Sequence, residues 1–582
     1  MKTIKFLKPY YIPTLIIFVL IYIQVVYSDL ALPDYMSKII NNGIINGSTS
    51  YILKTGGKMI LVSFLGIVTS VITGFLASRV GAKIARDLRL KVYDKVINYD
   101  HTSIKKFGVA SLITRTTNDI QQVQMFITIF LRMVVMAPVM AIGGIIKILD
   151  SNASMTWIVT VGVVALIILI AGIMSIAIPK FSKIQKLTDD LNLVTRENLT
   201  GMLVIRAFDK SAEENKKFDK VSKDITKTNL FVNKVMNIMS PGMTLIMNGV
   251  ILLIMWFGAK NIDAGNLEVG DMMAYIQYSM QIIMSFLFIS MMFVFMPRAI
   301  VSLKRIKEVL NTDNLVKDKK ETKKFNPKDT TIKFKNVSFR YDDAVDDILT
   351  GLDFEAKSGE VTAFIGSTGS GKSTLIDLVP RFYDVSGGQI LIDDIDIRDI
   401  KMHDLRDIIG YVPQKGVLFS GTIESNIKYA NKKISNDDMK KAAKISCSEE
   451  FILTKPKKFK DEIAQGGTNV SGGQKQRLSI ARAIASNPKI YIFDDSFSAL
   501  DFKTESMIRD SLNKNLAKST ILIVAQRVSS IMHADKIVVL DEGKIVGIGK
   551  HEDLMHNCPI YKEIALSQLT EEEAMKGVIK HA

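Results

Sequence analysis

A glycine-rich stretch with a single lysine carries the clearest chemistry in the sequence. Residues 366–373 read GSTGSGKS, which matches the pattern G-x-x-x-x-G-K-[ST] between the strand-like VTAFI and the helix-like TLIDLV. Glycines allow successive backbone N–H groups to point inward, and the helix that begins there adds the positive end of its dipole. The pattern predicts a loop that cradles phosphates, with Lys372 reaching the β and γ phosphates and the Ser373 hydroxyl ligating Mg²⁺.

Two adjacent carboxylates form the second chemical feature. Asp494 and Asp495 follow the strand-like IYIF, within the stretch IYIFDDSFSALD of residues 490–501. Two like charges at this distance resist joint ionisation, so the pair must face a cation or water. A solvated acidic turn explains the pair taken alone, but a phosphate-binding loop of this kind requires a carboxylate at a strand end to hold its metal ion. We therefore predict that Asp494 ligates Mg²⁺ beside Ser373.

Six long apolar stretches precede these motifs. The chain has 582 residues, of which 48% are apolar and 23% charged, with a mean hydropathy of +0.20. This mixture predicts a membrane part joined to a soluble part. A bilayer core of ~30 Å needs about 20 helical residues. The stretches that meet this length are 11–36, 57–78, 124–148, 155–178, 237–259 and 271–296. The first resembles a signal peptide, but no small-residue cleavage site follows it, so we interpret it as a retained helix.

Lysine and arginine gather on one side of the predicted spans. They precede the first stretch and crowd residues 79–115 and 180–217, whereas 41–56, 149–154 and 260–270 are short and nearly uncharged. The positive-inside rule therefore places both termini and the two long loops in the cytoplasm, and we expect the host to be the plasma membrane. The net charge of +16 is explained by this topology, without a nucleic-acid partner. Cys447 and Cys558 have no paired spacing and indicate ordinary buried thiols in a reducing compartment.

The elements around the motifs predict two domains. Residues 79–119 and 180–234 lack proline and keep helical spacing, so we expect the membrane helices to extend into the cytoplasm as hairpins with tips near 101–108 and 208–213. From residue 331 strand, turn and helix alternate, as in an α/β domain with a mostly parallel sheet. We predict an all-α membrane domain of six helices at 1–310, a polar linker at 311–330, an α/β P-loop domain at 331–569 and a solvated, charged tail at 570–582.

The string VSGGQKQRLSIARAI at residues 470–484 connects these features to a known family. Together with the phosphate loop and the six spans, it resembles the ATP-binding cassette (ABC) transporters, in particular exporters that fuse six membrane helices ahead of one nucleotide-binding domain. The resemblance covers nearly the whole chain. It implies that ATP and Mg²⁺ bind, and that two nucleotide-binding domains sandwich two ATP molecules between them. Each ATP would be held by the phosphate loop of one domain and the signature loop of the other.

The functional residues of that family match positions in this chain. Tyr341 in VSFRY resembles the aromatic residue that stacks on adenine, and Gln414 in YVPQ resembles the glutamine that senses Mg²⁺. Asp501 in SALD resembles the loop through which the two sites sense each other, and residues 196–208 resemble the cytoplasmic loop that couples to the opposite domain. The implied ATP-binding residues are Tyr341, Gly366, Ser367, Thr368, Gly369, Ser370, Gly371, Lys372, Ser373, Thr374 and Gln414; the metal ligands are Ser373, Gln414 and Asp494; the signature loop is Ser471, Gly472, Gly473 and Gln474.

Two catalytic positions depart from the family pattern. The position of the glutamate that orients or deprotonates the attacking water holds Asp495, and the position of the switch histidine holds Gln526. The aspartate carboxylate is one methylene shorter, which retracts it by roughly 1 Å, a misplacement that can cost about 100-fold in rate. Glutamine can donate a hydrogen bond to a γ-phosphate but carries no positive charge at neutral pH. We therefore expect a site that binds ATP and hydrolyses it poorly, beside a sound signature loop that serves the site of a different half-transporter.

Other readings of the same residues remain open. A homodimeric exporter with low turnover fits the two departures, and so does an ABC protein in which nucleotide binding gates or regulates. The spans contain few charges, which favours amphipathic or apolar cargo such as drugs, dyes or lipids. A methionine-rich stretch near residues 272–296 indicates either plain helix packing or an adaptable apolar surface. The six histidines show no metal-ligand spacing, so we expect them to have surface or packing roles.

Overall fold

The computed structural model of this chain describes residues 8–151, 155–342, 344–431 and 433–575. The basic residues Lys2 and Lys5, and the part of the predicted tail beyond residue 575, lie outside this description. The chain divides into two compact units. The first comprises Met1–Asn98 and Gly108–Thr312, and the second comprises Tyr99–Phe107 and Asp313–Ala582.

Six helical segments of the first unit are long and apolar enough to cross a membrane, which confirms the predicted number of spans within the described residues. They are Tyr11–Ile44, Thr49–Ile97, Val109–Asp150, Thr156–Thr200, Ser211–Asp263 and Val269–Ile289. Their main helices are α1 (Tyr11–Gln24), α2 (Ala31–Lys38), α3 (Thr49–Ile97), α5 (Val109–Thr116), α6 (Asn118–Ile129), α7 (Val135–Ser151), α8 (Thr156–Thr200), α10 (Ser211–Asn237), α11 (Met239–Asp263) and α12 (Val269–Asn311). The short helix α9 (Met202–Ala207) connects α8 to α10.

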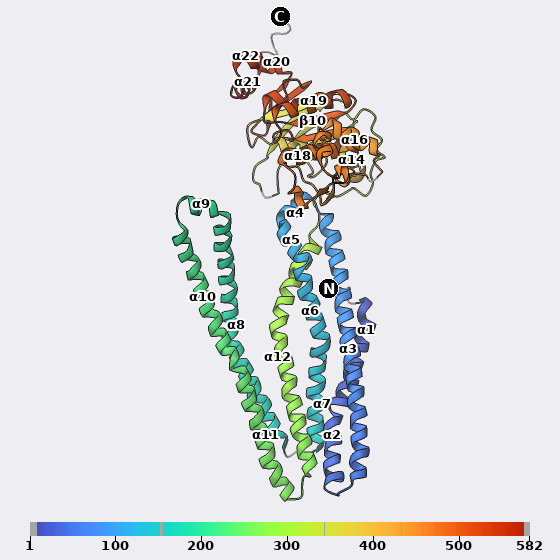
Figure 1. The fold of residues 1–582 in the computed structure, drawn as a ribbon, viewed down its shortest axis with the longest axis vertical. Helices are drawn as coiled ribbons and strands as arrows, with labels where there is room; N and C mark the ends of the chain where they lie inside the picture. The colour runs from blue at the N-terminus through green and yellow to red at the C-terminus, as the bar shows by residue number, and fades with distance from the viewer. Residues whose placement is uncertain (1–7, 152–154, 343, 432, 576–582) are drawn as a thin grey trace. The chain divides into compact units, whose positions relative to one another are not determined.

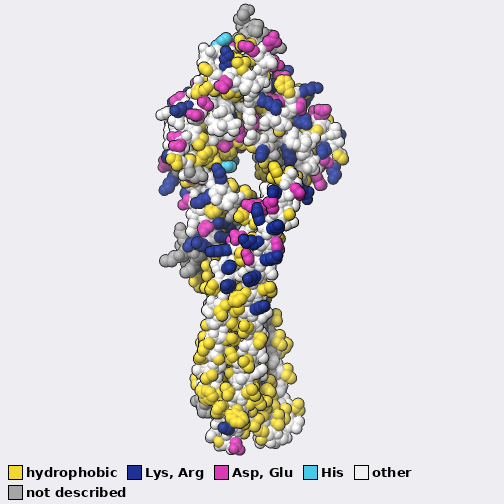
Figure 2. Space-filling view, turned by 90° about the vertical axis from the view of Figure 1, so that its left-hand side faces the viewer, with side chains coloured by type: hydrophobic (Ala, Val, Ile, Leu, Met, Phe, Trp, Pro, Cys, Tyr) yellow, Lys and Arg dark blue, Asp and Glu magenta, His cyan; other side chains and the backbone are white. Residues whose placement is uncertain are grey.

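Several of these helices are much longer than a bilayer is thick. Helix α3 has 49 residues and therefore spans about 70 Å, more than twice the hydrocarbon core of ~30 Å. The excess length forms the helical extensions expected from the proline-free loops. Figure 2 shows the two zones along the helices of this unit, a broad hydrophobic surface and, beyond one end of it, a region where Lys and Arg side chains gather.

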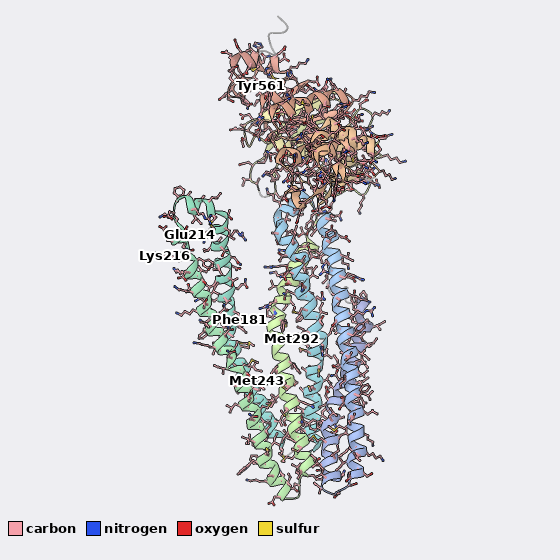
Figure 3. All side chains as sticks on the ribbon, in the orientation of Figure 1. Phe181, Glu214, Lys216, Met243, Met292 and Tyr561 are labelled. Atoms are coloured by element: carbon pink, nitrogen blue, oxygen red, sulfur yellow. The ribbon has the colours of Figure 1, made fainter. Side chains whose placement is uncertain are left out.

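Helices α8, α10 and α11 form a hairpin that lies apart from the rest of the unit over much of its length. Helix α8 packs against α10 and α11, whereas α12 packs against α6 and α7. In Figure 1 the hairpin diverges from α12 toward its α9 end. Figure 3 places Phe181 and Met243 on the hairpin and Met292 on α12. The hairpin therefore presents long faces that the same unit does not cover.

A polar network links α2, α7 and α12 near their ends. The Lys147 ammonium lies 2.5 Å from the Asp34 carboxylate, which also accepts a hydrogen bond from the Tyr278 hydroxyl. On the next turns Ser37 donates to Asp271 at 2.6 Å. Tyr278 is fully buried. Lys147 and Asp34 neutralise each other, so this pair adds little net charge to the membrane-spanning part of the unit.

The second unit contains a mostly parallel sheet, as the strand and helix alternation predicted. Its order is β12-β11-β3-β10-β9-β6, with every neighbouring pair parallel except β11 and β12. The same unit also contains an antiparallel sheet of four strands in the order β2-β1-β4-β5. The strands are β1 (Ile332–Phe339), β2 (Leu349–Ala356), β3 (Val361–Gly366), β4 (Gly387–Ile392), β5 (Ile395–Asp396), β6 (Ile409–Val412), β9 (Ile490–Asp494), β10 (Thr520–Val524), β11 (Lys536–Asp541) and β12 (Lys544–Gly549).

Strand β9 shows how this sheet is buried on both faces. All five of its residues are buried, and the first four alternate between two hydrophobic clusters. Ile490 and Ile492 pack into one cluster, while Tyr491 and Phe493 pack into the other. Successive side chains of a strand point to opposite faces, so a continuous apolar run is what a strand covered on both sides requires.

Short helices complete the second unit. They are α4 (His101–Phe107), α13 (Lys372–Leu378), α14 (Met402–Asp407), α15 (Ile423–Ile427), α16 (Asn436–Ile445), α17 (Glu449–Thr454), α18 (Gly472–Ala485), α19 (Phe502–Asn515), α20 (His551–Asn557), α21 (Pro559–Leu566) and α22 (Glu571–Met575). The predicted solvated tail begins with α22, but Ala574 in that helix is fully buried. This turn is therefore docked, because Ala574 lies in a hydrophobic cluster of the second unit and Met575 packs against the same cluster. Cys558 is buried as expected, whereas Cys447 is only half-buried.

Candidate nucleotide-binding site

The predicted site residues meet at one edge of the parallel sheet. The phosphate loop follows β3, Asp494 ends β9, and Gln526 lies two residues after β10. In the register of the sheet Val524 of β10 lies beside both Asp494 of β9 and Phe364 of β3. Because all three strands are parallel, the segments that leave their carboxyl ends emerge together. The topology thus assembles residues that are more than 100 positions apart in the chain.

The phosphate loop is shaped by glycines in the left-handed region. Gly369 has φ +89° and Gly371 has φ +91°, and helix α13 begins directly after Gly371. The Lys372 ammonium turns back onto the loop and donates to the Gly366 carbonyl at 3.0 Å, the Ser367 carbonyl at 2.6 Å and Ser370 Oγ at 3.2 Å. Burial lowers the pKa of this lysine, although the nearby carboxylates oppose the shift. A bound phosphate would replace the loop oxygens as its partner.

Replacing Gly369 or Gly371 with alanine distinguishes the cost of a left-handed backbone from the cost of a steric clash of the added Cβ. A Cβ on Gly371 would lie 2.6 Å from Leu349 Cδ2, whereas a Cβ on Gly369 would meet nothing within 4 Å. We expect Gly369→Ala to cost about 1–2 kcal/mol of stability through the left-handed backbone alone. Gly371→Ala should cost about 2–4 kcal/mol, because a core contact must also shift. Thermal unfolding of the detergent-purified full chain without nucleotide measures both, and equal shifts for the two variants would contradict this account.

Ser373 and Asp494 converge as a metal site requires. Ser373 Oγ donates to Asp494 Oδ1 at 2.9 Å, and the Asp494 carboxylate is buried. Burial raises the pKa of Asp494, and the charge of Asp495 adds to the effect. A divalent cation between hydroxyl and carboxylate would offset this cost of burying negative charge. The donor set therefore fits Mg²⁺, which would neutralise phosphate charge there.

Asp495 is held by the two glutamines of the site. Its Oδ2 atom accepts from Gln526 Nε2 at 2.8 Å and from Gln414 Nε2 at 3.0 Å. The side chain is buried, and the backbone at Asp495 has φ +44°, with its N–H donating to the Val524 carbonyl. Both glutamines donate through nitrogen, so the amide oxygen of Gln414 is the atom that would ligate a cation. The short carboxylate is thus fixed by two neutral donors that cannot supply charge.

Tyr341, the predicted adenine-stacking residue, already has several neighbours within the second unit. Its hydroxyl lies 3.0 Å from Thr374 Oγ1, which ties it to the first turn of α13. The Lys105 ammonium of α4 lies over its ring, 5.4 Å from the ring centroid. A base that stacks on Tyr341 must therefore use the other face of the ring or displace Lys105. The sequence pattern offered no signal for this lysine.

The predicted signature loop forms the exposed beginning of α18. Ser471 is the N-cap, whose hydroxyl accepts from the Gln474 N–H at 3.3 Å while the Gln474 amide oxygen accepts from the Ser471 N–H at 3.1 Å. This reciprocal capping presents the helix N-terminus to solvent, a suitable place for a phosphate. Asp501 is likewise an N-cap, accepting from the Thr504 N–H at 2.9 Å at the start of α19, and this contact lowers its pKa.

Comparison with known proteins decides the family. The ABC transporter transmembrane region model matches residues 14–286, and the ABC transporter model matches residues 349–498. An uncharacterized ABC transporter ATP-binding protein of Mycobacterium tuberculosis is 37% identical over 546 residues, which cover 93% of this chain and 93% of the relative. The chain belongs to the ABC transporter family. A second relative of this ABC transporter, the uncharacterized ABC transporter ATP-binding protein YfiB of Bacillus subtilis, is 34% identical over 98% of this chain and 99% of its own length.

The fold of this ABC transporter also has a solved counterpart. The structure of a bacterial Atm1-family ABC exporter with ATP bound matches it with a TM-score of 0.79. The match covers 96% of this chain and 98% of the exporter at 24% sequence identity, so the likeness is one of fold. The chain therefore has the fold of an exporter-type ABC half-transporter, with six candidate membrane helices and one nucleotide-binding domain. Membrane residence and ATP binding follow from the family.

Proposed function

We propose that this chain is the subunit of a heterodimeric ABC exporter that contributes the weakly hydrolytic ATP site. The single observation that carries the proposal is the Asp495 carboxylate held between Gln414 and Gln526. A general base must reach the attacking water, and a shortened carboxylate bound to two amide donors is poorly placed for that. Lys372, Ser373 and Asp494 keep the phosphate and Mg²⁺ functions, so nucleotide binding is retained while hydrolysis is slow.

The exposed signature loop is evidence that the partner in the dimer differs from this chain. Ser471 and Gln474 build a complete capping box on the surface, ready to bind the γ-phosphate of an ATP held elsewhere. In a homodimer that ATP would lie in a second copy of the same impaired site. A companion with a catalytic glutamate and a switch histidine would give the intact loop a productive use.

Exposed apolar side chains on the long hairpin are evidence that a second half-transporter packs against it. Leu193 of α8 is 54% exposed and lies about 55 Å along the helix from Thr156, beyond a hydrocarbon core of ~30 Å. Leu199 and Phe231 are also exposed, at 68% and 44%. Large apolar side chains on a face that lipid does not reach favour coverage by protein. We propose that the helices of the companion half cover them.

Membrane orientation and cargo follow from the charge pattern. Lys and Arg gather on the helical extensions, which supports a cytoplasmic location for these extensions and the nucleotide-binding domain, with the plasma membrane as host. Closure of the two nucleotide-binding domains on ATP would favour the outward-facing membrane helices, because ATP binds the closed state more tightly. Few charged residues lie within the spans, and Lys147 and Asp34 pair with each other, which favours amphipathic or apolar cargo.

Affinity purification of the full chain from its native membranes tests the proposal. We expect a second, different half-transporter to co-purify in equal amount, and the reconstituted pair to move amphipathic dyes across a vesicle membrane when ATP is present. Vesicles without ATP are the control.

Two outcomes would favour the other readings. Full ATP-driven transport by this chain alone would establish a homodimer. ATP-dependent currents in a planar bilayer without dye transport would establish a nucleotide-gated pore.

A further inference from the structure

The loop that carries Gln526 is clamped by a side chain near the end of the chain. Gln568 Nε2 donates to the Gln526 carbonyl at 2.8 Å, and Gln568 Oε1 accepts from the Val528 N–H at 2.8 Å. One amide side chain thus satisfies the two backbone groups that flank Arg527, as a neighbouring strand would. On the following residue, Arg509 of α19 donates to the Ser529 carbonyl at 2.6 Å. The loop is therefore fixed from two sides by elements distant in sequence.

Gln568 is in turn positioned by the docked C-terminal helices. It lies just after α21, where its own N–H donates to the Ala565 carbonyl at 3.1 Å. Tyr561 and Ala565 of α21 are fully buried, and Figure 3 labels Tyr561 within these helices. His551 of α20 joins the group, with Nδ1 at 2.7 Å from the Tyr561 hydroxyl and Nε2 at 2.9 Å from the Ala574 carbonyl of α22. These contacts hold Gln568 at a fixed place against the sheet.

The clamp acts on the backbone of the residue whose side chain enters the site. The Gln526 amide donates to Asp495 Oδ2 at 2.8 Å, while its carbonyl is held by Gln568. We propose that Gln568 is a positioning residue through which helices α20, α21 and α22 set the Gln526 amide in the ATP site. This inference rests on the proposed function in one respect, that Gln526 contacts the γ-phosphate of ATP bound to this chain. It assigns a role to Gln568, which belongs to no predicted motif, and to α22, which lies in the tail predicted to be solvated.

The first experiment tests, without nucleotide, whether Gln568 holds the loop that carries Gln526. Hydrogen exchange is followed in the full chain in lipid nanodiscs for Gln568→Ala, for Gln568→Glu, and for the control Ser567→Ala, whose hydroxyl bonds the Ile564 carbonyl. We expect the Val528 amide to exchange about five- to tenfold faster in Gln568→Ala. Gln568→Glu keeps an acceptor for that amide, so its protection should be largely rescued. Unchanged exchange at Val528 in Gln568→Ala would overturn the clamp.

The effect on the site is measured by a double-mutant cycle on Mg·ATP affinity. We expect Gln568→Ala to weaken binding to this chain about fivefold, and to have no further effect when Gln526 is already alanine. Gln568→Glu should also weaken binding, because it loses the donor to the Gln526 carbonyl. Additive effects of the two alanines would overturn the positioning role. If Gln526→Ala alone leaves affinity unchanged while Val528 loses protection in Gln568→Ala, the γ-phosphate contact of the proposed function is wrong, and Gln568 serves packing rather than the site.

Discussion

Replacing Asp495 with glutamate and Gln526 with histidine in the same chain is expected to raise ATP hydrolysis at this site by about 100-fold. Glutamate adds the missing methylene, so its carboxylate can advance by roughly 1 Å toward the attacking water. Histidine replaces one of the two amide donors that now hold Oδ2 and can carry positive charge beside the γ-phosphate. Each single substitution should give a smaller gain, since the two groups act on one reaction.

Vanadate trapping assigns the hydrolysis to one polypeptide. A photoreactive ATP analogue is hydrolysed, trapped with vanadate and cross-linked, and the labelled half-transporter is identified on a gel. In the unaltered transporter we expect trapping on the companion half. In the Asp495→Glu, Gln526→His variant we expect trapping on this chain as well. The proposal of a degenerate site fails if the unaltered chain is already labelled strongly, or if the double variant gains no label.

Replacing Ser471 with alanine is expected to lower turnover of the assembled transporter by about 100-fold while this chain still binds ATP at its own phosphate loop. The Ser471 hydroxyl would bind the γ-phosphate of an ATP held by the companion, and loss of one such donor at a reacting group typically costs this much. The lost N-cap costs only about 1 kcal/mol of helix stability, so the domain should remain folded.

Two measurements on one preparation separate these effects. Steady-state ATPase activity is expected to report the site of the proposed companion half, and photolabelling with the ATP analogue on ice reports binding to this chain. Ser471→Thr keeps a hydroxyl and a capping group and is the matched control, expected to retain most of the activity. If the Ser471→Ala variant loses photolabelling of this chain but keeps its ATPase rate, the signature loop serves the ATP bound to this chain, and the prediction is wrong.

Features that depend on neighbours in sequence were predictable. Six apolar runs of membrane length predict six spans, and these are found within the described residues. The phosphate loop was predictable because its glycine spacing and flanking strand and helix specify a local backbone shape, which the structure shows at Gly369 and Gly371. The pairing of Ser373 with Asp494 was also expected, since a strand end and a phosphate loop meet at one edge of a parallel sheet.

Contacts between distant segments were not predictable. Tyr341 matches a family position, but nothing in its local sequence indicates that Lys105 lies over its ring. Gln568 belongs to no motif, and its two hydrogen bonds to the Gln526 loop depend on where α21 docks. The tail was expected to be solvated because its charges dominate its composition, yet its first turn packs onto the core of the second unit through Ala574 and Met575.

The sequence by itself determined the family, the six spans, the phosphate loop and the departures from the family pattern at Asp495 and Gln526, because each depends on residue type and short-range spacing. Only the tertiary structure decided that Asp495 is held between Gln414 and Gln526 and that the C-terminal helices reach the same loop. A hydrogen bond between residues far apart in the chain exists only when packing of the whole domain brings donor and acceptor to about 3 Å, and no local pattern encodes that distance.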